Sequence, residues 1–181
     1  MSATDPSHTG GLAGTPEPPS YQTPGPQDGA ELWRMARDSQ TLDLNSPYMY
    51  LLGASHFAET SVIARVGGHP AGFVFGYLRP DAPDTLFVWQ VGVDPEHRGK
   101  RIAHGMLAAL VDRLTPRYLE ASVTPDNAAS AALFTGFARA NGVPLENSEV
   151  LFAASQFPAG TSHQPEVLYR IGPFDRVPDT R

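Results

Sequence analysis

Cysteine is absent from the 181 residues of this chain, which excludes disulfide bonds, thiolate catalysis and cysteine-ligated zinc or iron–sulfur sites. The six histidines form no H-x-x-x-H or H-x-H pair, so we expect no metal. Apolar runs stay well short of the roughly 20 residues that span a bilayer. The first residues also lack the basic and apolar segments of a secretory signal. We therefore expect a cytoplasmic protein with no membrane partner.

Basic charge is also scarce, with 13 Lys and Arg residues against 19 Asp and Glu residues and a formal net charge of −6. Nucleic-acid-binding domains normally carry a basic face, so we expect no nucleic-acid partner. An acidic balance fits a cationic small molecule better, although many acidic proteins owe their charge to solubility alone.

Large apolar side chains are nearly missing from residues 1–29, which are rich in Pro, Gly, Ser and Thr. Such a segment cannot bury enough surface to offset the entropy of ordering it. The composition predicts a disordered N-terminal tail over 1–29, one folded domain over 30–172 and a short C-terminal tail over 173–181.

Within the domain, turn residues and apolar spacing predict the order β-α-β-β-β-α-β-α-β-β. The expected strands cover 31–37, 60–66, 71–78, 84–93, 117–123, 148–154 and 166–172, and the expected helices cover 46–60, 101–114 and 127–142. Ser46 and Pro47 suit a helix start, and Gly67 and Gly68 suit a hairpin turn. This order is typical of a single α/β domain with a mixed sheet.

A basic, glycine-containing loop joins strand 84–93 to the helix that follows it. The free N–H groups of a helix's first turn bind anions, Gly99 allows close approach of the backbone, and Arg98, Lys100 and Arg101 add positive charge. Taken alone, a basic glycine loop before a helix is about as often an ordinary connection as an anion-binding site. The pattern is neither G-x-G-x-x-G nor G-x-x-x-x-G-K-[ST], which disfavours a dinucleotide or P-loop site.

The stretch "VGVDPEHRGKRIAHGML" resembles the acetyl-CoA signature of the GNAT superfamily of N-acyltransferases, with Arg101 where the family usually has Gly. "TPDNAASAALF" resembles the family's second motif, N-x-x-[AS]-x-x-L-[YF]. The resemblance implies a GNAT-type, mostly antiparallel sheet flanked by helices, and acetyl-CoA as acetyl donor. The implied cofactor-binding residues are Val91, Gly92, Val93, Arg98, Gly99, Lys100, Arg101, Ile102, Ala103, His104, Asn127 and Phe134. Many relatives have Tyr at Phe134 to protonate the leaving thiolate, so here water or another residue does so, or protonation is late.

Four further segments are similar to the GNAT enzymes that acetylate L-2,4-diaminobutyrate in ectoine synthesis. They are "LDLNSPYMYLL", "GFVFGYLRPDAPDTLFVWQVGVDP", "YLEASVTPDNAASAALF" and "EVLYRIGPF". The resemblance implies acetyl transfer to the 4-amino group of L-2,4-diaminobutyrate by a homodimer. Two alternatives stay open: a GNAT enzyme for another small amine or a protein N-terminus, and a non-catalytic acyl-CoA-binding module.

Acetyl transfer to an amine requires a group that takes a proton from the ammonium form of the acceptor. Asp43 and Glu166 are the carboxylates in the enzyme-specific segments, and we expect both to be catalytic and to bind the acceptor. The backbone N–H at Val91 is expected to polarise the thioester carbonyl. Tyr48, Trp89 and His163 complete the expected acceptor site, in which Tyr48 and Trp89 donate hydrogen bonds to the acceptor's carboxylate.

Plainer interpretations compete with each of these assignments. Trp89 could belong to the core, Asp43 could be a turn or cap residue, and Glu166 and His163 could be solvated. Segments 43–50 and 157–170 are expected to close over a small acceptor, whereas a protein acceptor would need an open groove.

Overall fold

The computed structural model describes residues 17–39, 42–160 and 162–174, and these form one seven-stranded mixed sheet with helices on both faces. The strand order is β1-β2-β3-β4-β5-β7-β6, with β4 and β5 parallel and every other pair antiparallel. The expected fold class is confirmed. The strands are β1 (Ser20–Gln22), β2 (Val62–Val66), β3 (His69–Arg79), β4 (Ala82–Val93), β5 (Tyr118–Val123), β6 (Leu145–Phe152) and β7 (Glu166–Ile171). The α-helices are α1 (Gly29–Ser39), α2 (Pro47–Gly53), α3 (Ile102–Leu114) and α4 (Ala128–Asn141).

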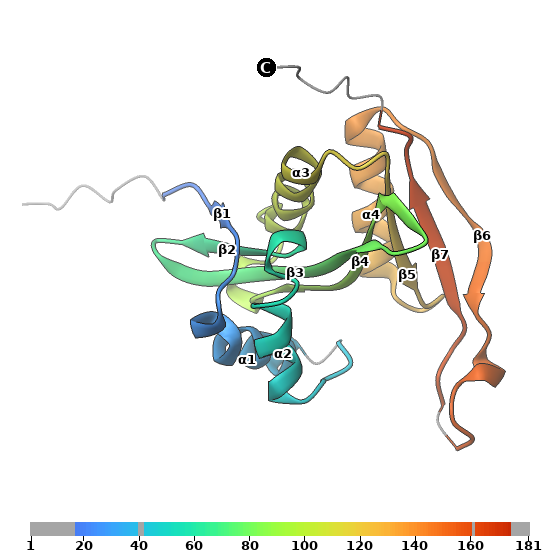
Figure 1. Ribbon diagram of the computed structural model, residues 1–181, viewed down its shortest axis with the longest axis horizontal. Coiled ribbons are helices and arrows are strands. Elements are labelled where there is room, and N and C mark those ends of the chain that lie inside the picture. The colour runs from blue at the N-terminus through green and yellow to red at the C-terminus, as the bar shows by residue number, and fades with distance from the viewer. Residues whose placement is uncertain (1–16, 40–41, 161, 175–181) are drawn as a thin grey trace, which may run out of the picture.

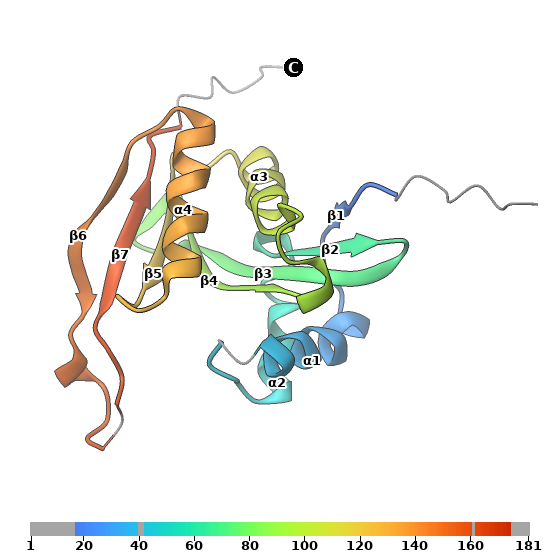
Figure 2. The same ribbon diagram turned by 180° about the vertical axis from the view of Figure 1, so that it is seen from behind.

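Two apolar clusters hold the helices on opposite faces of the sheet (Figures 1 and 2). Helices α3 and α4 bury residues such as Leu110 and Phe137 against one face, and helices α1 and α2 bury Leu32 and Tyr50 against the other. Strands β6 and β7 continue past the body of the molecule as a long arm, which Figure 1 shows at the edge of the sheet. None of the helices in the described ranges is long and apolar enough to cross a membrane.

The expected strand at 31–37 is wrong, because these residues belong to helix α1. Leu32, Met35, Ala36 and Ser39 are buried, and their spacing of three, four and seven residues lines one side of a helix. Residues 31–37 read polar-apolar-apolar-polar-apolar-apolar-polar, so their apolar positions recur at helical spacing and do not alternate as those of a strand would. The first strand is instead β1, which pairs with β2 from Ser20–Arg65 to Gln22–Ile63.

The expected N-terminal tail is therefore wrong for its second half. Tyr21 of β1 packs on the core, and Asp28 forms an ion pair with Arg65 at 2.5 Å. An edge strand needs little apolar sequence, because its backbone hydrogen bonds to β2 supply much of the attachment. At the other end Phe174 is buried against Phe137, so the expected C-terminal tail also began too early. The rest of both tails, 1–16 and 175–181, lies outside the described residues.

Most other elements match their expected ranges, but the helix expected over 46–60 is too long: α2 ends at Gly53, and a separate 3-10 helix, η2 (Ala58–Thr60), precedes β2. The β2–β3 turn places Gly67 at φ 56° and Gly68 at φ 79°, the positive angles that a tight hairpin requires. Ser46 takes the extended conformation before α2, although its side chain makes no capping hydrogen bond. Helix α4 ends at Gly142, which has left-handed backbone angles and closes the last turn. A short 3-10 helix, η3 (Pro95–His97), connects β4 to the basic loop.

Candidate active site

Strands β4 and β5 pair only from Thr85–Tyr118 to Val88–Ala121 and then part. The rest of β4, residues 89–93, pairs with β3 alone, so its backbone groups on the β5 side are free of sheet hydrogen bonds. A cavity of about 670 Å³ opens at the parting, with Val91 on β4 and Ser122 on β5, Asn127 at the start of α4 and Phe134 farther along this helix. An extended, amide-rich molecule can lie here and pair with β4 as a strand would.

A β-bulge marks the same point of β4. Phe75 pairs with Gln90 and Gly76 pairs with Val88, which leaves Trp89 as an extra residue between them. The bulge turns Trp89 outward, so 42% of this side chain is exposed although its strand is central. The core interpretation of Trp89 is therefore excluded, and its ring lines two cavities.

The basic loop and the first turn of α3 line a second cavity of about 460 Å³. Arg98, Gly99, Arg101 and His104 contribute from the loop and α3, and Arg139 contributes from α4. Three guanidinium groups beside free helix N–H groups fit a polyanion such as a pyrophosphate. The residues expected to bind the cofactor are brought together here and in the cavity between β4 and β5, with two exceptions.

Lys100 and Gly92 line none of the three cavities. The Lys100 ammonium lies 3.5 Å from the His97 ring nitrogen. Gly92 lies against the Phe73 ring. A Cβ at position 92 would stand only 2.5 Å from that ring, so the role of the glycine is to let β4 pass over it.

Arg101 occupies the position at which the GNAT signature usually has glycine, and its backbone is left-handed with φ 60°. The arginine thus keeps the glycine-like conformation at an energetic cost of about 1–2 kcal/mol. In the next turn, burial and then the charge of Arg101 lower the pKa of His104 below 6.5. A histidine in this environment stays neutral at physiological pH.

Asn127 is the N-cap of α4, and its Oδ1 accepts a hydrogen bond from the Ser130 N–H at 3.0 Å. Its side-chain amide nitrogen remains on the side of the cavity between β4 and β5 as a potential donor. Phe134 is 3% exposed and packs near Tyr169, so it shapes the cavity wall chiefly as part of the core.

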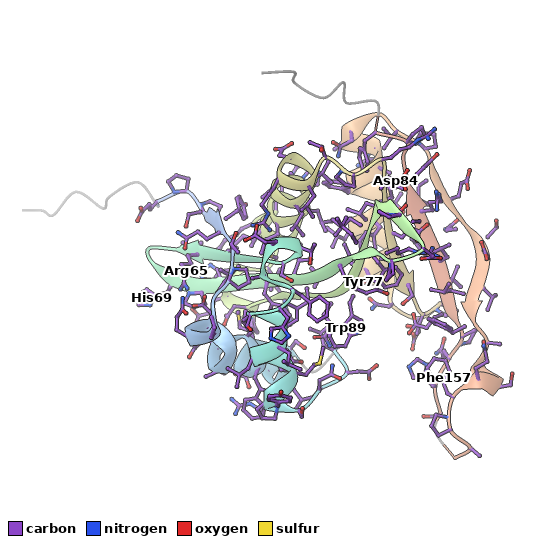
Figure 3. All side chains as sticks on the ribbon, viewed as in Figure 1. Arg65, His69, Tyr77, Asp84, Trp89 and Phe157 are labelled. Atoms are coloured by element: carbon purple, nitrogen blue, oxygen red, sulfur yellow. The ribbon has the colours of Figure 1, made fainter. Side chains whose placement is uncertain are left out.

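A third cavity, also of about 670 Å³, lies on the face of the sheet that α1 and α2 share. Its floor is Phe75, Tyr77, Phe87 and Trp89, which alternate along β3 and β4. Figure 3 shows Tyr77 and Trp89 on the sheet and Phe157 across from them on the β6–β7 arm. Five residues line both this cavity and the one between β4 and β5: Asp43, Trp89, Ser122, His163 and Glu166. The two spaces therefore meet at these side chains.

His163 lies at the centre of that junction. Its Nε2 is 3.8 Å from Asp43 Oδ2 and 3.9 Å from Glu166 Oε1, and its ring stacks on Phe157. Its Nδ1 is 2.7 Å from the Gln164 carbonyl oxygen. Because a carbonyl only accepts, Nδ1 carries the hydrogen and Nε2 of the neutral ring is left as the proton acceptor.

A cluster of ion pairs closes the end of the third cavity that lies opposite His163. Arg79 binds Asp81 at 2.6 Å and the fully buried Glu120 at 2.8 Å, and Arg170 binds the second oxygen of Glu120. The hydrogen bonds that Arg79 donates to Asp81 and then to Glu120 raise the pKa of Arg79. The cluster links β3, β5 and β7 and fixes this wall of the cavity.

The structure brings together Asp43, Trp89, His163 and Glu166, as expected, but not Tyr48. Tyr48 is 67% exposed on α2 and lines none of the three cavities. Sequence reasoning missed Tyr77, Gln90, Arg139 and Phe157. Phe157 opens the segment expected to close over the acceptor, and Tyr77 and Gln90 lie in a segment similar to the diaminobutyrate-acetylating enzymes, whereas Arg139 had no signal. No group of three His, Asp or Glu residues that could hold a metal occurs in the described part of the chain.

Comparison with known proteins gives one family and two informative relatives. The model of the acetyltransferase (GNAT) family matches residues 27–137, which include β4 and the basic loop but stop before Arg139, His163 and Glu166. The L-2,4-diaminobutyric acid acetyltransferase of Streptomyces anulatus is 54% identical over 164 residues, covering 86% of this chain and 90% of that one. This likeness spans more of the chain than the family match does.

Among solved structures, the diaminobutyrate acetyltransferase EctA from Paenibacillus lautus, in complex with its substrate L-2,4-diaminobutyric acid and coenzyme A, has a TM-score of 0.83. It is 40% identical, and the match covers 89% of this chain and 98% of that chain. The ribosomal-protein-S18-alanine N-acetyltransferase of Escherichia coli has a TM-score of 0.66 at 14% identity, covering 90% and 98% of the two chains. The latter likeness concerns the fold alone.

Proposed function

The chain belongs to the GNAT family of acetyltransferases, and on that premise we propose that it transfers the acetyl group of acetyl-CoA to the 4-amino group of L-2,4-diaminobutyrate. The observation that carries the proposal is the junction at which Asp43, His163 and Glu166 meet the bulge of β4. Two of the relatives named above, those from Streptomyces anulatus and Paenibacillus lautus, are named for their action on this diamine, and their likeness spans more of the chain than the family match does.

Acetyl-CoA supplies an acetyl group activated as a thioester. The cavity between β4 and β5 and the cationic cavity at α3 together suit a molecule with an amide-containing arm and phosphates. Arg98, Arg101 and Arg139 hold the phosphates by charge-assisted hydrogen bonds. The Val91 N–H polarises the thioester carbonyl, since donors aimed at developing negative charge lower the barrier.

The acceptor amine must lose a proton before it attacks. A lysine-like pKa near 10.4 leaves only about one amine in 10³ uncharged at neutral pH. We assign proton transfer to His163, whose Nε2 is free to accept and is flanked by Asp43 and Glu166. The two carboxylates attract the ammonium groups of the diamine, and they stabilise the imidazolium once His163 has taken the proton.

Selection of the 4-amino group follows from anchoring the carboxylate end of the acceptor away from the thioester. With Tyr48 outside the cavities, this role falls to the indole N–H of Trp89. A site that hydrogen-bonds a substrate group rejects analogues without that group by large factors. Putrescine-like diamines without a carboxylate are therefore expected to be poor acceptors.

The test is CoA release by the purified protein across a panel of amines, followed by NMR of the product. The panel includes ornithine and lysine. A cavity of about 670 Å³ is larger than diaminobutyrate requires, so a longer diamino acid is the second candidate substrate. Diaminobutyrate should give the highest kcat/KM and the N4 product. Glu166→Gln and Asp43→Asn should each lower kcat/KM by at least about tenfold, or 1.4 kcal/mol of transition-state stabilisation. No turnover of diaminobutyrate, or mainly N2 product, would overturn the proposal.

The homodimer, the cytoplasmic location and the place in ectoine synthesis that the resemblance implied stay predictions. Light scattering of the eluting protein gives its mass in solution and tests the first of them.

A further inference from the structure

Gln90 is the residue after Trp89 at the bulge of β4, and it is only 6% exposed. Burying an amide costs free energy unless both of its ends are hydrogen-bonded. Its Oε1 has no hydrogen-bond partner within the described ranges. An apolar side chain would occupy this position at less cost to stability, so the amide calls for a role in the site.

The Nε2 end of the Gln90 amide indicates what this role is. Gln90 Nε2 donates a hydrogen bond of 2.9 Å to the backbone carbonyl of Asp43. A carbonyl only accepts, so this contact fixes which way the amide points. The Asp43 side chain itself is 94% exposed, and its place beside His163 depends on where its backbone is held. The nearest additional support is Asn45, whose Nδ2 reaches the same carbonyl at 3.3 Å.

The start of the same segment is also attached to the cofactor side of the molecule. Arg98 of the basic loop donates to the Ser39 carbonyl at the end of α1, at 3.4 Å. Thus side chains from β4 and from the loop after it bind the backbone at Asp43 itself and at Ser39, four residues before it. The strand that presents the thioester also sets the position of Asp43.

We propose that Gln90 is a positioning residue of the acceptor site, which holds the Asp43 carboxylate at a fixed distance from the thioester and beside His163. The inference rests on the proposed function and adds a residue to it. Gln90 acts through Asp43, so its loss weakens the hold on the diamine and leaves the hold on acetyl-CoA intact.

Two variants of the full chain test this. Gln90→Met keeps the approximate size and removes the donor, and Gln90→Glu keeps the shape and sets an oxygen against the Asp43 carbonyl. Each should raise the KM for diaminobutyrate by about tenfold or more and change the KM for acetyl-CoA by less than about twofold. Gln90→Met should melt at the wild-type temperature or above it, because the unpaired Oε1 is gone. Gln22→Met, on the exposed part of β1, is the matched control and should change neither KM.

A double-mutant cycle separates positioning from a merely structural role. In an Asp43→Ala background, Gln90→Met should add less than about a twofold loss in kcat/KM, since the group it positions is already missing. Additive losses, an equal rise in both KM values or an unchanged diaminobutyrate KM would each overturn the inference. If Gln90→Met does not fold, the KM ratio of Gln90→Glu decides. Wild-type protein that leaves diaminobutyrate unacetylated overturns the proposed function and this inference together, whereas an active wild type with unaffected Gln90 variants overturns this inference alone.

Discussion

The imidazole ring of His163 lies flat against the ring of Phe157, with centroids 3.8 Å apart and planes 8° from parallel. This stack and the Gln164 carbonyl hold the ring so that Nε2 faces Asp43 and Glu166. All of these contacts except those to Asp43 come from the connection between β6 and β7 and the first residue of β7. The arm is therefore the element that completes the site, and its tip is the part of the chain on which the proposed proton transfer depends.

We expect His163→Gln to lower kcat for diaminobutyrate by about 10²-fold at pH 7, in line with the contribution of a general base. The loss should shrink as the pH approaches the pKa of the amine, because the acceptor then loses its proton without help. A pH–rate profile checks this. His69→Gln is the control and should match wild type, because His69 is the exposed first residue of β3 and lies far from Trp89 in Figure 3. An equal loss at every pH would argue that His163 only shapes the cavity.

Arg101→Gly should raise the free energy of unfolding by about 1 kcal/mol, because glycine adopts a φ of 60° without the cost that arginine bears. The same change removes a guanidinium from the phosphate cavity, so the KM for acetyl-CoA should rise several-fold. Arg101→Ala is the matched variant, with the charge lost and the backbone cost kept. Denaturant unfolding and steady-state kinetics measure the two effects, and equal stability of the Gly and Ala variants would contradict the first.

Gly105→Ala should destabilise the protein by about 1–3 kcal/mol and raise the KM for acetyl-CoA. A Cβ at position 105 would stand 2.0 Å from the Tyr21 hydroxyl, so either β1 or the first turn of α3 must move. Tyr21→Ala should restore most of the loss when it is combined with Gly105→Ala. Gly136→Ala, where a Cβ meets no atom within 4 Å, is the control and should be neutral or stabilising. Failure of Tyr21→Ala to rescue would show that the clash is relieved elsewhere.

His104 should make stability depend on pH in mild acid. Burial lowers its pKa in the folded state below 6.5, so the unfolded chain binds a proton more readily. Its contribution is fully present above pH 6.5 and is lost as the pH falls through the lower, folded-state pKa. Unfolding of wild type and His104→Gln from pH 7.5 to 4.5 should give a shallower decline in the variant. Parallel curves would contradict the assignment, and an NMR titration of the His104 ring gives its pKa directly.

Local sequence determined the elements whose signals are complete within a few residues. Gly67 and Gly68 predicted the hairpin. The Gly-containing basic loop before α3 was by itself compatible with an anion site or an ordinary connection, and only the family resemblance favoured the site. The helix ends at Pro47 and Gly142 follow from the conformations those residues prefer. These features depend on backbone angles and on contacts between nearest neighbours, and both can be inferred from residues adjacent in the sequence.

Tertiary structure decided everything that joins distant segments. Strand β1 formed because β2 offered an open edge to a segment with few apolar residues. Trp89 faces a cavity because a register shift against β3 turns it outward, and a shift of that kind depends on the partner strand. His163, Asp43 and Glu166 meet because β5 and β7 pair beyond the point at which β4 and β5 part. The sequence named these three residues as candidates, but only the path of the chain gave the 3.8 Å and 3.9 Å separations that make them one site.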